Sequence, residues 1–272
     1  MADAEACAKV ARMSMTTVGD HLRTWRQRRR LSQLDLALEA EISQKHLSFV
    51  ESGRAAPSRD MVLRLADRLD VPLRERNTLL LAAGYAPHYA ERPLDDAAMA
   101  PVREAMQRVL AAHEPAPALV IDRHWNLVAK NRMIDPMLRY VAPRLLEPPI
   151  NVLRLSLDPE GMAQRIENLS EWRAHLLHRL RSQRAHEDDA VLKALHEQLL
   201  ALPGPRSAEA SPNAIAVPLR LRAGQTVLSF LSMTMVFGAP LDVTVADLAI
   251  ETFLPEDDAT ADALKRIMAS SA

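Results

Sequence analysis

Residues 31–57 hold the polar side chains whose spacing has the clearest chemical meaning in this chain. They form two short helical patterns separated by a tight turn, and the second begins at Ser43 with the polar pair Gln44 and Lys45. A short helix that is polar at its start and apolar along one face fits into the DNA major groove. These residues therefore predict a DNA-reading element in the first quarter of the chain.

Five short helices are expected over residues 16–86 to hold this element in place. Apolar residues recur at helical spacing in each of them, and Gly53 and Gly84 are typical of helix ends. A side chain that can accept a backbone hydrogen bond precedes most of these helices, which predicts a compact all-α bundle. The expected caps are Thr16 or Thr17, Ser32, Ser43 and Ser58.

The stretch RRRLSQLDLALEAEISQKHLSFVESGRAAPS, residues 28–58, resembles the helix-turn-helix domain of the phage-repressor type, the Cro/C1 or XRE family. The resemblance extends over most of residues 16–86, and several of its features hold at fixed spacing. They are Gln33 opening the second helix, Ala37 within it, Ile42 in the turn, Ser43 and Gln44 opening the third helix, Glu51 to Arg54 closing it, and Pro57 before the fourth.

The resemblance implies which side chains of the third helix meet the bases. Gln44, Lys45 and Ser48 would lie on its groove-facing side, with base contacts concentrated near its N-terminal end. Glutamine and lysine carry donors and acceptors that suit adenine or guanine edges, and Phe49 would touch a thymine methyl group.

Phosphate contacts are implied for other matching positions. Gln33 and Ser43 lie at helix N-termini, where backbone N–H groups and the helix dipole favour phosphate. Arg28, Arg29 and Arg54 are predicted phosphate clamps, which add affinity without sequence information.

The charge balance requires the nucleic-acid surface to be local, because the whole chain has a net charge of −1. An arginine run on a helix also fits an ordinary solvated face, and small capped bundles also serve as protein-binding modules. The candidate basic surface consists of Arg23, Arg26, Arg28, Arg29 and Arg30.

Residues 87–100 read as a linker, because prolines and the acidic pair Asp95 and Asp96 interrupt the helical pattern. A further helix is expected over residues 99–112, with apolar residues on one side. This helix would either pair with its twin in a dimer or pack on the next domain, and the sequence leaves both open.

The hydrophobic period changes to two in parts of residues 101–272, which predicts an α+β domain. Two strands, several helices and three more strands would form an antiparallel sheet of about five strands, with one face covered by helices. Pro218 indicates an edge or a bulge. The expected strands are residues 118–122, 126–130, 215–221, 226–237 and 248–254, and a closing helix covers residues 259–268.

This order of elements resembles a PAS-like sensor domain, and more specifically the MmyB-like ligand-binding domain that follows an XRE head in actinobacterial and proteobacterial regulators. Three segments carry the resemblance: PALVIDRHWNLVAKN, NVLRLSLDPEGM and NLSEWRAHLLHRLR. It implies a fatty-acyl ligand in a cavity between sheet and helices. The chain departs from the pattern at Met133 and Ile134, whose bulk would reshape the pocket.

A lipid pocket needs adaptable apolar walls and one polar end. Four residues of the long strand share one face and are predicted walls: Leu231, Met233, Met235 and Phe237. The alternative is that these residues, like the five that follow, are ordinary core residues or caps. The shape and the polar end of the pocket are assigned to Trp125, Asn131, Arg154, Trp172 and His175.

Patterns for catalysis or a metal centre fail at defined positions. His196 and Glu197 begin a zinc-peptidase HExxH motif, but Leu200 stands where the second histidine is required. His175 and His178 could share a metal, yet no third ligand has clear spacing. The motifs GxSxG, GxxxxGK and GxGxxG are absent. We expect no enzyme activity, no metal and no cofactor beyond a bound fatty acid or similar apolar ligand.

The chain is expected to be cytoplasmic and to have no membrane partner. The start of the sequence lacks an apolar signal core, and the longest apolar stretch, residues 227–237, is too short to span a bilayer. Cys7 is the single cysteine, so no disulfide can form within one chain.

We therefore predict a homodimeric transcriptional regulator that binds a double-stranded DNA operator and senses a small apolar effector. The expected organisation is a flexible tail (1–15), a helix-turn-helix domain (16–86), a linker (87–100) and a ligand-binding and dimerisation domain (101–272). Two alternatives stay open: a DNA-tethered acyl-processing enzyme, and an antitoxin-like regulator that binds a protein partner.

Overall fold

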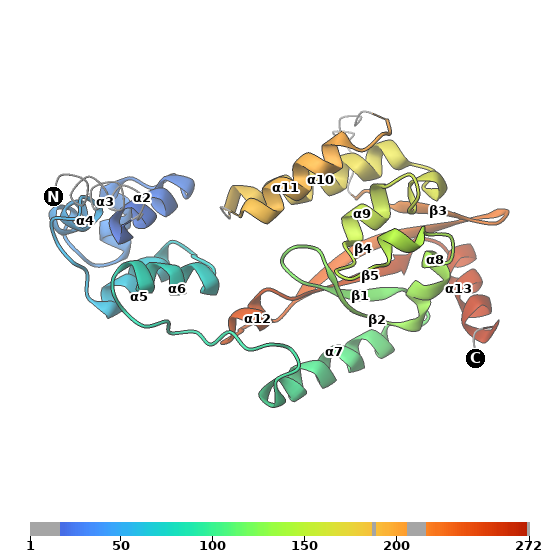
Figure 1. Cartoon of the computed structure of the whole chain (residues 1–272), viewed down its shortest axis with the longest axis horizontal. Coiled ribbons are helices and arrows are strands. Elements are labelled where there is room, and N and C mark those ends of the chain that lie inside the picture. Colours follow the sequence, from blue (N-terminus) through green and yellow to red (C-terminus); the bar gives the residue numbers. More distant parts are fainter. Residues whose placement is uncertain (1–16, 187–188, 206–215, 271–272) are drawn as a thin grey trace, which may run out of the picture. The chain divides into compact units, whose positions relative to one another are not determined.

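The computed structural model describes residues 17–186, 189–205 and 216–270. The chain forms two compact units (Figure 1). The first comprises the chain up to Arg92 together with residues 241–246, and the second comprises residues 93–240 and 247–272. The predicted N-terminal tail and Cys7 lie outside the described residues.

The first unit contains the five predicted helices, and its all-α class is confirmed. Thr17 and Ser32 form capping boxes with Asp20 and Asp35, so each cap satisfies backbone donors at both ends of its first turn. Ser43 and Ser58 cap their helices with single side-chain hydrogen bonds. The helices are α2 (Val18–Arg28), α3 (Gln33–Glu39), α4 (Gln44–Glu51), α5 (Arg59–Arg68) and α6 (Leu73–Ala82).

The core of the first unit is a set of leucines contributed by every helix. Leu22, Leu36, Leu47, Leu65 and Leu80 have no or almost no exposed surface and belong to one apolar cluster. Burial of such side chains contributes about 1.5–3 kcal/mol each. The cluster therefore fixes the positions of the helices around α4.

Gly19 sets how closely α2 approaches α4. A Cβ atom at this position would lie 2.5 Å from the carbonyl oxygen of Val50 and 2.8 Å from that of Glu51. Backbone oxygens cannot move aside as a flexible side chain can, so only glycine fits between these two helices.

The predicted linker does not begin at residue 87. The side-chain oxygen of Asn77 on α6 accepts hydrogen bonds from the backbone N–H groups of His88 and Tyr89, at 2.9 and 3.0 Å, and its amide donates to the carbonyl of Tyr89. Residues up to Arg92 are thus part of the first unit.

A distant part of the chain completes the first unit. Residues 241–246, which include the short helix α12 (Val243–Ala246), stand between two strands of the second unit in sequence. Asp242 is buried and accepts a hydrogen bond from Arg92 at 2.8 Å, and the N–H of Val243 donates to the carbonyl of Ala90. This attachment is not predictable from the local sequence pattern.

The second unit is built on the predicted antiparallel sheet of five strands, in the order β2-β1-β5-β4-β3. Pro218 directly precedes β3, which is an edge strand, so the missing N–H costs no internal ladder bond. Residues 216–218, predicted as strand, are not part of it, and Ile215 lies outside the described residues. The strands are β1 (Ala118–Ile121), β2 (Leu127–Lys130), β3 (Leu219–Ala223), β4 (Thr226–Val236) and β5 (Ala249–Pro255).

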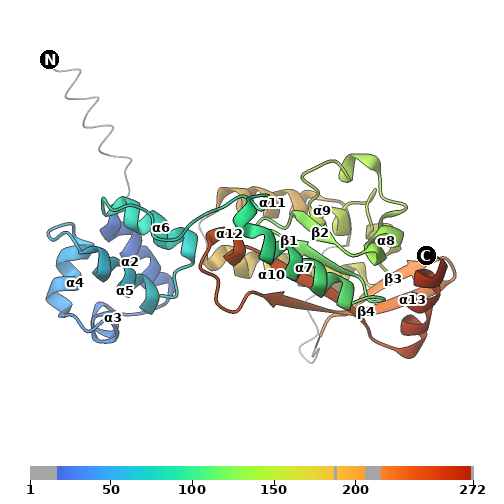
Figure 2. The ribbon, with the colours of Figure 1, turned by 90° about the horizontal axis from the view of Figure 1, so that it is seen from below.

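Helices cover both faces of this sheet (Figures 1 and 2). Helix α7 (Ala100–Ala112) buries Met106 and Leu110 against Val120 of β1 and Ile250 of β5. The sequence left open whether this helix pairs with its twin or packs on the next domain. Its apolar face packs on the sheet. The opposite face carries α9 (Val152–Leu157), α10 (Leu169–His186) and α11 (Ala190–Ala201), with α13 (Asp258–Ser270) against β4 and β5.

Short helical turns connect these elements. One of them, η1 (Ala97–Met99), precedes α7. The others lie between β2 and α10 and are η2 (Arg132–Ile134), α8 (Asp135–Leu138), η3 (Pro143–Leu145) and η4 (Ala163–Arg165).

Replacing Gly19 by alanine tests the close approach of α2 and α4. We expect Gly19→Ala to lower the free energy of unfolding of the first unit by about 1–3 kcal/mol, because the overpacked methyl group forces the helices apart. Differential scanning calorimetry measures the change. Gly238→Ala is the control, because a Cβ atom there meets no atom within 4 Å. Equal stability of the two variants would contradict the expectation.

Candidate DNA interface and ligand pocket

A buried ion pair joins three helices of the first unit. The Arg26 guanidinium donates to both carboxylate oxygens of Glu51, with Nε–Oε1 at 2.7 Å and Nη2–Oε2 at 2.9 Å. The side-chain amide of Gln33 donates to the same carboxylate at 2.8 Å. Glu51 ends α4, so the pair fixes this helix against α2 and the start of α3.

This arrangement raises the pKa of Arg26 through its hydrogen bond to Glu51. Burial by itself raises the pKa of Glu51, but the hydrogen bonds from Arg26 and Gln33 outweigh it and hold that pKa below its ordinary value. Both groups are therefore charged in the folded unit.

The ion pair corrects one part of the predicted basic surface. Arg26 is only 8% exposed and bonded inside the unit, so it does not belong to a solvent-facing arginine cluster. Gln33 is half-buried and bonded to Glu51, a contact that the sequence analysis did not assign to it. Periodicity shows on which face of a helix a residue lies, but it does not show that Arg26 pairs with a residue 25 positions away.

The predicted base-reading residues lie along one side of α4. Gln44 and Lys45 are exposed in its first turn, and Ser48 and Phe49 are half-buried. Lys45 Nζ and the Arg54 guanidinium lie 5.7 and 4.8 Å from the centre of the Phe49 ring. Cations at this distance from an aromatic face are attracted to it. Two cations therefore lie against the Phe49 ring on this side of α4.

The other predicted phosphate clamps differ in their surroundings. Arg28 and Arg29 lie over the Trp25 ring, with guanidinium carbons 5.2 and 5.8 Å from its centre. Arg29 also donates to the carbonyls of Leu69 and Asp70, both at 2.7 Å. Arg29 thus stabilises the end of α5, a structural role that the sequence analysis missed.

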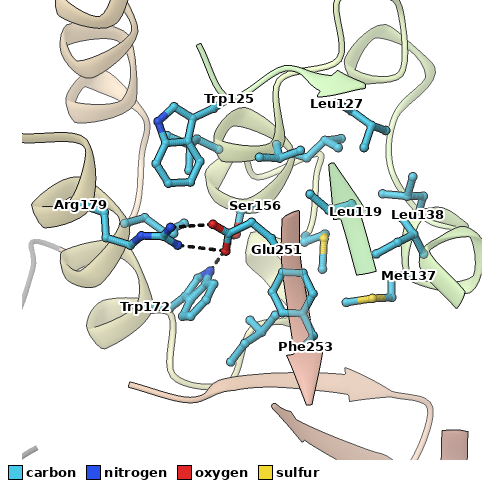
Figure 3. A pocket seen from close by; sticks show the side chains of 17 residues that line it. Leu119, Trp125, Leu127, Met137, Leu138, Ser156, Trp172, Arg179, Glu251 and Phe253 are labelled. Atoms are coloured by element: carbon cyan, nitrogen blue, oxygen red, sulfur yellow. Dashed lines mark hydrogen bonds and ion pairs between the residues drawn. The ribbon is translucent and has the colours of Figure 1, made fainter. Parts of the chain in front are cut away.

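The second unit contains an apolar cavity of about 80 Å³ between the sheet and its helices (Figure 3). One water needs roughly 10–15 Å³ on the same scale, so the cavity holds several waters or a segment of an apolar ligand. Its lining comprises Leu119, Trp125, Leu127, Ile134, Met137, Leu138, Val152, Leu153, Leu155, Ser156, Met162, Trp172, Leu176, Arg179, Leu219, Glu251 and Phe253.

The polar end of the cavity is an ion pair between Arg179 on α10 and Glu251 on β5, which point toward each other in Figure 3. Arg179 Nη2 lies 2.6 Å from Glu251 Oε1, and Nη1 lies 3.1 Å from Oε2. Thr234, opposite Glu251 in the sheet, donates to Oε1 at 2.8 Å. The Trp125 ring covers the guanidinium at 4.8 Å.

Trp125 lines the cavity and has a backbone conformation that is unusual for its residue type. Its φ is +66°, which is rare for a bulky residue, and its indole N–H donates to Gln183 at 2.9 Å. Such conformations cost about 1–3 kcal/mol and persist where the surroundings fix them. Trp172 donates to the hydroxyl of Ser156 at 2.9 Å. Both tryptophans, which the sequence analysis assigned to the pocket, are among the residues that line this cavity.

The remaining polar residues predicted for the pocket lie elsewhere. Asn131 is buried and bonded to the backbone of Ala118, Leu110 and Ala116, so it joins β1 to the end of α7. Arg154 donates to Gln198 on α11 at 2.5 Å. Neither residue is in the cavity lining, which corrects their predicted placement.

His175 stacks on Trp172, with ring centres 5.3 Å apart. Its Nε2 atom is buried without a hydrogen-bond partner. Burial and the nearby Arg179 charge lower the pKa of His175, so the ring is neutral near pH 7. It supports the indole and does not itself line the cavity.

The predicted walls on β4 require a correction. Leu231, Met233, Met235 and Phe237 share a face, but Met235 and Phe237 pack on the α7 side of the sheet. Met233 is 52% exposed. The cavity side of β4 carries the alternate residues, such as Phe230 in the main core cluster and Thr234 beside the ion pair. The prediction assigned the strand to the wrong face.

Several residues that line the cavity were not predicted as pocket residues, although the sequence contains patterns that indicate them. Trp172, Leu176 and Arg179 follow helical spacing i, i+4 and i+7, which places Arg179 on the pocket side of α10. Glu251 is the charged residue within the apolar strand β5. Ile134, expected to reshape the pocket, lines this cavity, whereas Met133 lines a second cavity of about 50 Å³.

The described residues contain neither a metal-binding cluster nor a membrane-spanning helix. In the part of the chain that the structure describes, no three His, Cys, Asp or Glu side chains gather as a metal site would require. Across the same residues, every helix is too short or too polar to cross a bilayer. His196 of the broken zinc motif bonds to Arg184 at 2.9 Å.

The two units define a class of protein. A helix-turn-helix head and a PAS-like α+β domain with an internal cavity are the parts of a DNA-binding transcription regulator with a ligand-sensing domain.

Comparison with known families identifies both parts. The model of the MmyB-like transcription regulator ligand binding domain matches residues 102–267, and a helix-turn-helix model matches residues 22–76. The chain therefore belongs to the MmyB-like transcription regulators. No protein in the curated collections matches it.

Neutralising Glu51 tests the ion pair under α4. Because the folded pKa of Glu51 is lowered, the carboxylate contributes stability above its unfolded pKa of about 4.3, and this contribution is lost as pH falls through the folded pKa. We expect Glu51→Gln to cost about 1–3 kcal/mol at pH 7 and to flatten the loss of stability between about pH 5 and 3. Hydrogen exchange of α4 amides measures both effects.

The control is Glu39→Gln, because Glu39 is exposed at the end of α3. An unchanged acid profile in the Glu51 variant would show that the carboxylate is not the group whose protonation loosens α4.

Proposed function

We propose that the chain acts as a homodimer in which each head reads one half-site of an operator, and that a fatty-acyl-like effector in the cavity changes operator affinity. The observation that carries the proposal is the combination of an exposed polar start of α4 with an apolar cavity that ends in an ion pair. Two half-sites in such systems are about one helical turn apart.

The DNA contacts follow from the surface of α4. Gln44 and Lys45 meet base edges, Ser48 and Phe49 lie deeper along the groove, and Arg54 reaches a phosphate beside the Phe49 ring. The N-termini of α3 and α4, at Gln33 and Ser43, face the backbone on either side, with Arg28 and Arg29 adding positive charge.

The effector acts on the heads through the connections of the chain. The chain passes between the units after Arg92, after Pro240 and after Ala246. The last two connections join β4 and β5, the strands that carry Thr234 and Glu251, to α12. A ligand that changes the spacing of these strands shifts the heads only as far as its affinity differs between the two arrangements.

The base-reading role of α4 is tested by the double variant Gln44→Ala/Lys45→Ala. We expect specific operator binding to weaken by about 30-fold or more, because each of the two lost base contacts costs about 1–3 kcal/mol. Selection of a binding site from random DNA, followed by footprinting, measures the loss. The matched control Gln27→Ala/Arg68→Ala removes an exposed amide and an exposed cation from α2 and α5. Unchanged footprints of the α4 variant would refute the assignment.

The effector role is tested by filling the cavity. Leu127→Trp introduces a large ring at a half-buried position of the lining, and Val227→Trp places the same ring at an exposed position of β4. We expect saturating decanol to change the operator dissociation constant of the wild type and of the Val227 variant several-fold, and to leave the Leu127 variant unaffected. Native mass spectrometry reports bound ligand and dimer together. Equal responses of both variants would place the effector elsewhere.

A further inference from the structure

We infer that the cavity selects amphiphiles with an uncharged polar head, such as alcohols, amides or esters, over anionic carboxylates. The inference rests on the proposed effector site and names the chemical class that this site takes. It follows from the polar end of the cavity, where the cation that would receive a carboxylate is already neutralised by a carboxylate of the protein.

Among the described residues, Arg179 and Glu251 are the charged side chains that line the cavity, so their charges cancel. Both carboxylate oxygens of Glu251 are bonded to the guanidinium, and Oε1 also accepts from Thr234. The Glu251 side chain is only 5% exposed. A pair with this geometry and burial leaves no unsatisfied positive charge at the polar end.

An anionic head would therefore meet the carboxylate of Glu251, which is almost fully buried. Like charges at short range in such surroundings repel strongly, and separating the pair would leave Glu251 buried without its partner. Loss of a buried partner is the costly step, because the charge keeps its desolvation penalty.

Arg179 is the one cationic side chain that lines the cavity among the residues that the structure describes. His175 stacks on Trp172, and burial together with the Arg179 charge lowers the pKa of its ring. Arg154 is bonded to Gln198 outside the lining, and Arg165 lines the second cavity. Arg173 donates to the carbonyls that end α11.

Uncharged heads find suitable partners at the same place. The Ser156 hydroxyl accepts from the Trp172 indole and keeps its own proton to donate. A neutral carbonyl or hydroxyl oxygen can accept a hydrogen bond from the Ser156 O–H, and it brings no negative charge close to Glu251. The apolar lining then takes the chain of the ligand.

The test compares decanol and decanamide with decanoate at pH 8, where decanoate is ionised, each below its micellar concentration. Titration calorimetry of the full chain measures the dissociation constants. We expect the neutral ligands to bind the wild type at least about 10-fold more tightly than decanoate, which corresponds to about 1.4 kcal/mol. The wild-type comparison needs no variant and stands even if a variant fails to fold.

Glu251→Gln provides the decisive change, because it removes the negative charge and keeps the shape. With Arg179 no longer neutralised, we expect decanoate affinity to rise and the preference to fall by about 10-fold or to reverse. Glu104→Gln, on the exposed side of α7, makes the same change of net charge away from the cavity and should keep the wild-type preference.

The outcomes separate the inference from the proposed function. Equal or tighter binding of decanoate to the wild type overturns the inference but keeps an apolar effector. A folded Glu251→Gln variant with the wild-type preference also overturns it. Binding of none of the three ligands to the wild type would instead refute the effector role on which the inference rests.

Discussion

The buried carboxylate of Glu51 is the interaction on which the DNA-reading head depends. It accepts hydrogen bonds from Arg26 of α2 and Gln33 of α3 while it ends α4. A lone buried carboxylate is costly, so the three helices are stable together only in the arrangement that satisfies it. The leucine core holds the helices together, but apolar contacts are not directional. The carboxylate therefore determines the orientation in which α4 presents Gln44 and Lys45.

The ligand domain uses the same type of pair for a different purpose. Arg179 and Glu251 are also bonded through both carboxylate oxygens and also receive a third hydrogen bond, from Thr234. Buried ion pairs often contribute little net stability compared with apolar residues of similar volume, because desolvation offsets the attraction. The pair at the cavity is therefore better understood through what it does to a ligand. It gives an apolar pocket one polar end without giving it a net charge.

Much of the fold can be predicted from local sequence, and the predictions that were wrong have a common cause. Helix caps such as Thr17, Ser32 and Ser43 act within four residues, so they are readable from the chain. Strand β4 has apolar residues on both faces, and its alternation therefore does not show which face meets the cavity. The roles of Arg26 and Arg29 depend on partners 25 and 40 positions away. Neither periodicity nor composition specifies such partners.

The attachment of residues 241–246 to the first unit is a contact between distant parts of the chain that periodicity and composition do not specify. An acidic residue in a loop, Asp242, reads as solvated, yet it is buried against Arg92 and beside Ala90. In the chain, α12 lies between β4 and β5, and Glu251 stands only five residues after Ala246. The strands that set the chemistry of the cavity are thus the same strands that hold α12.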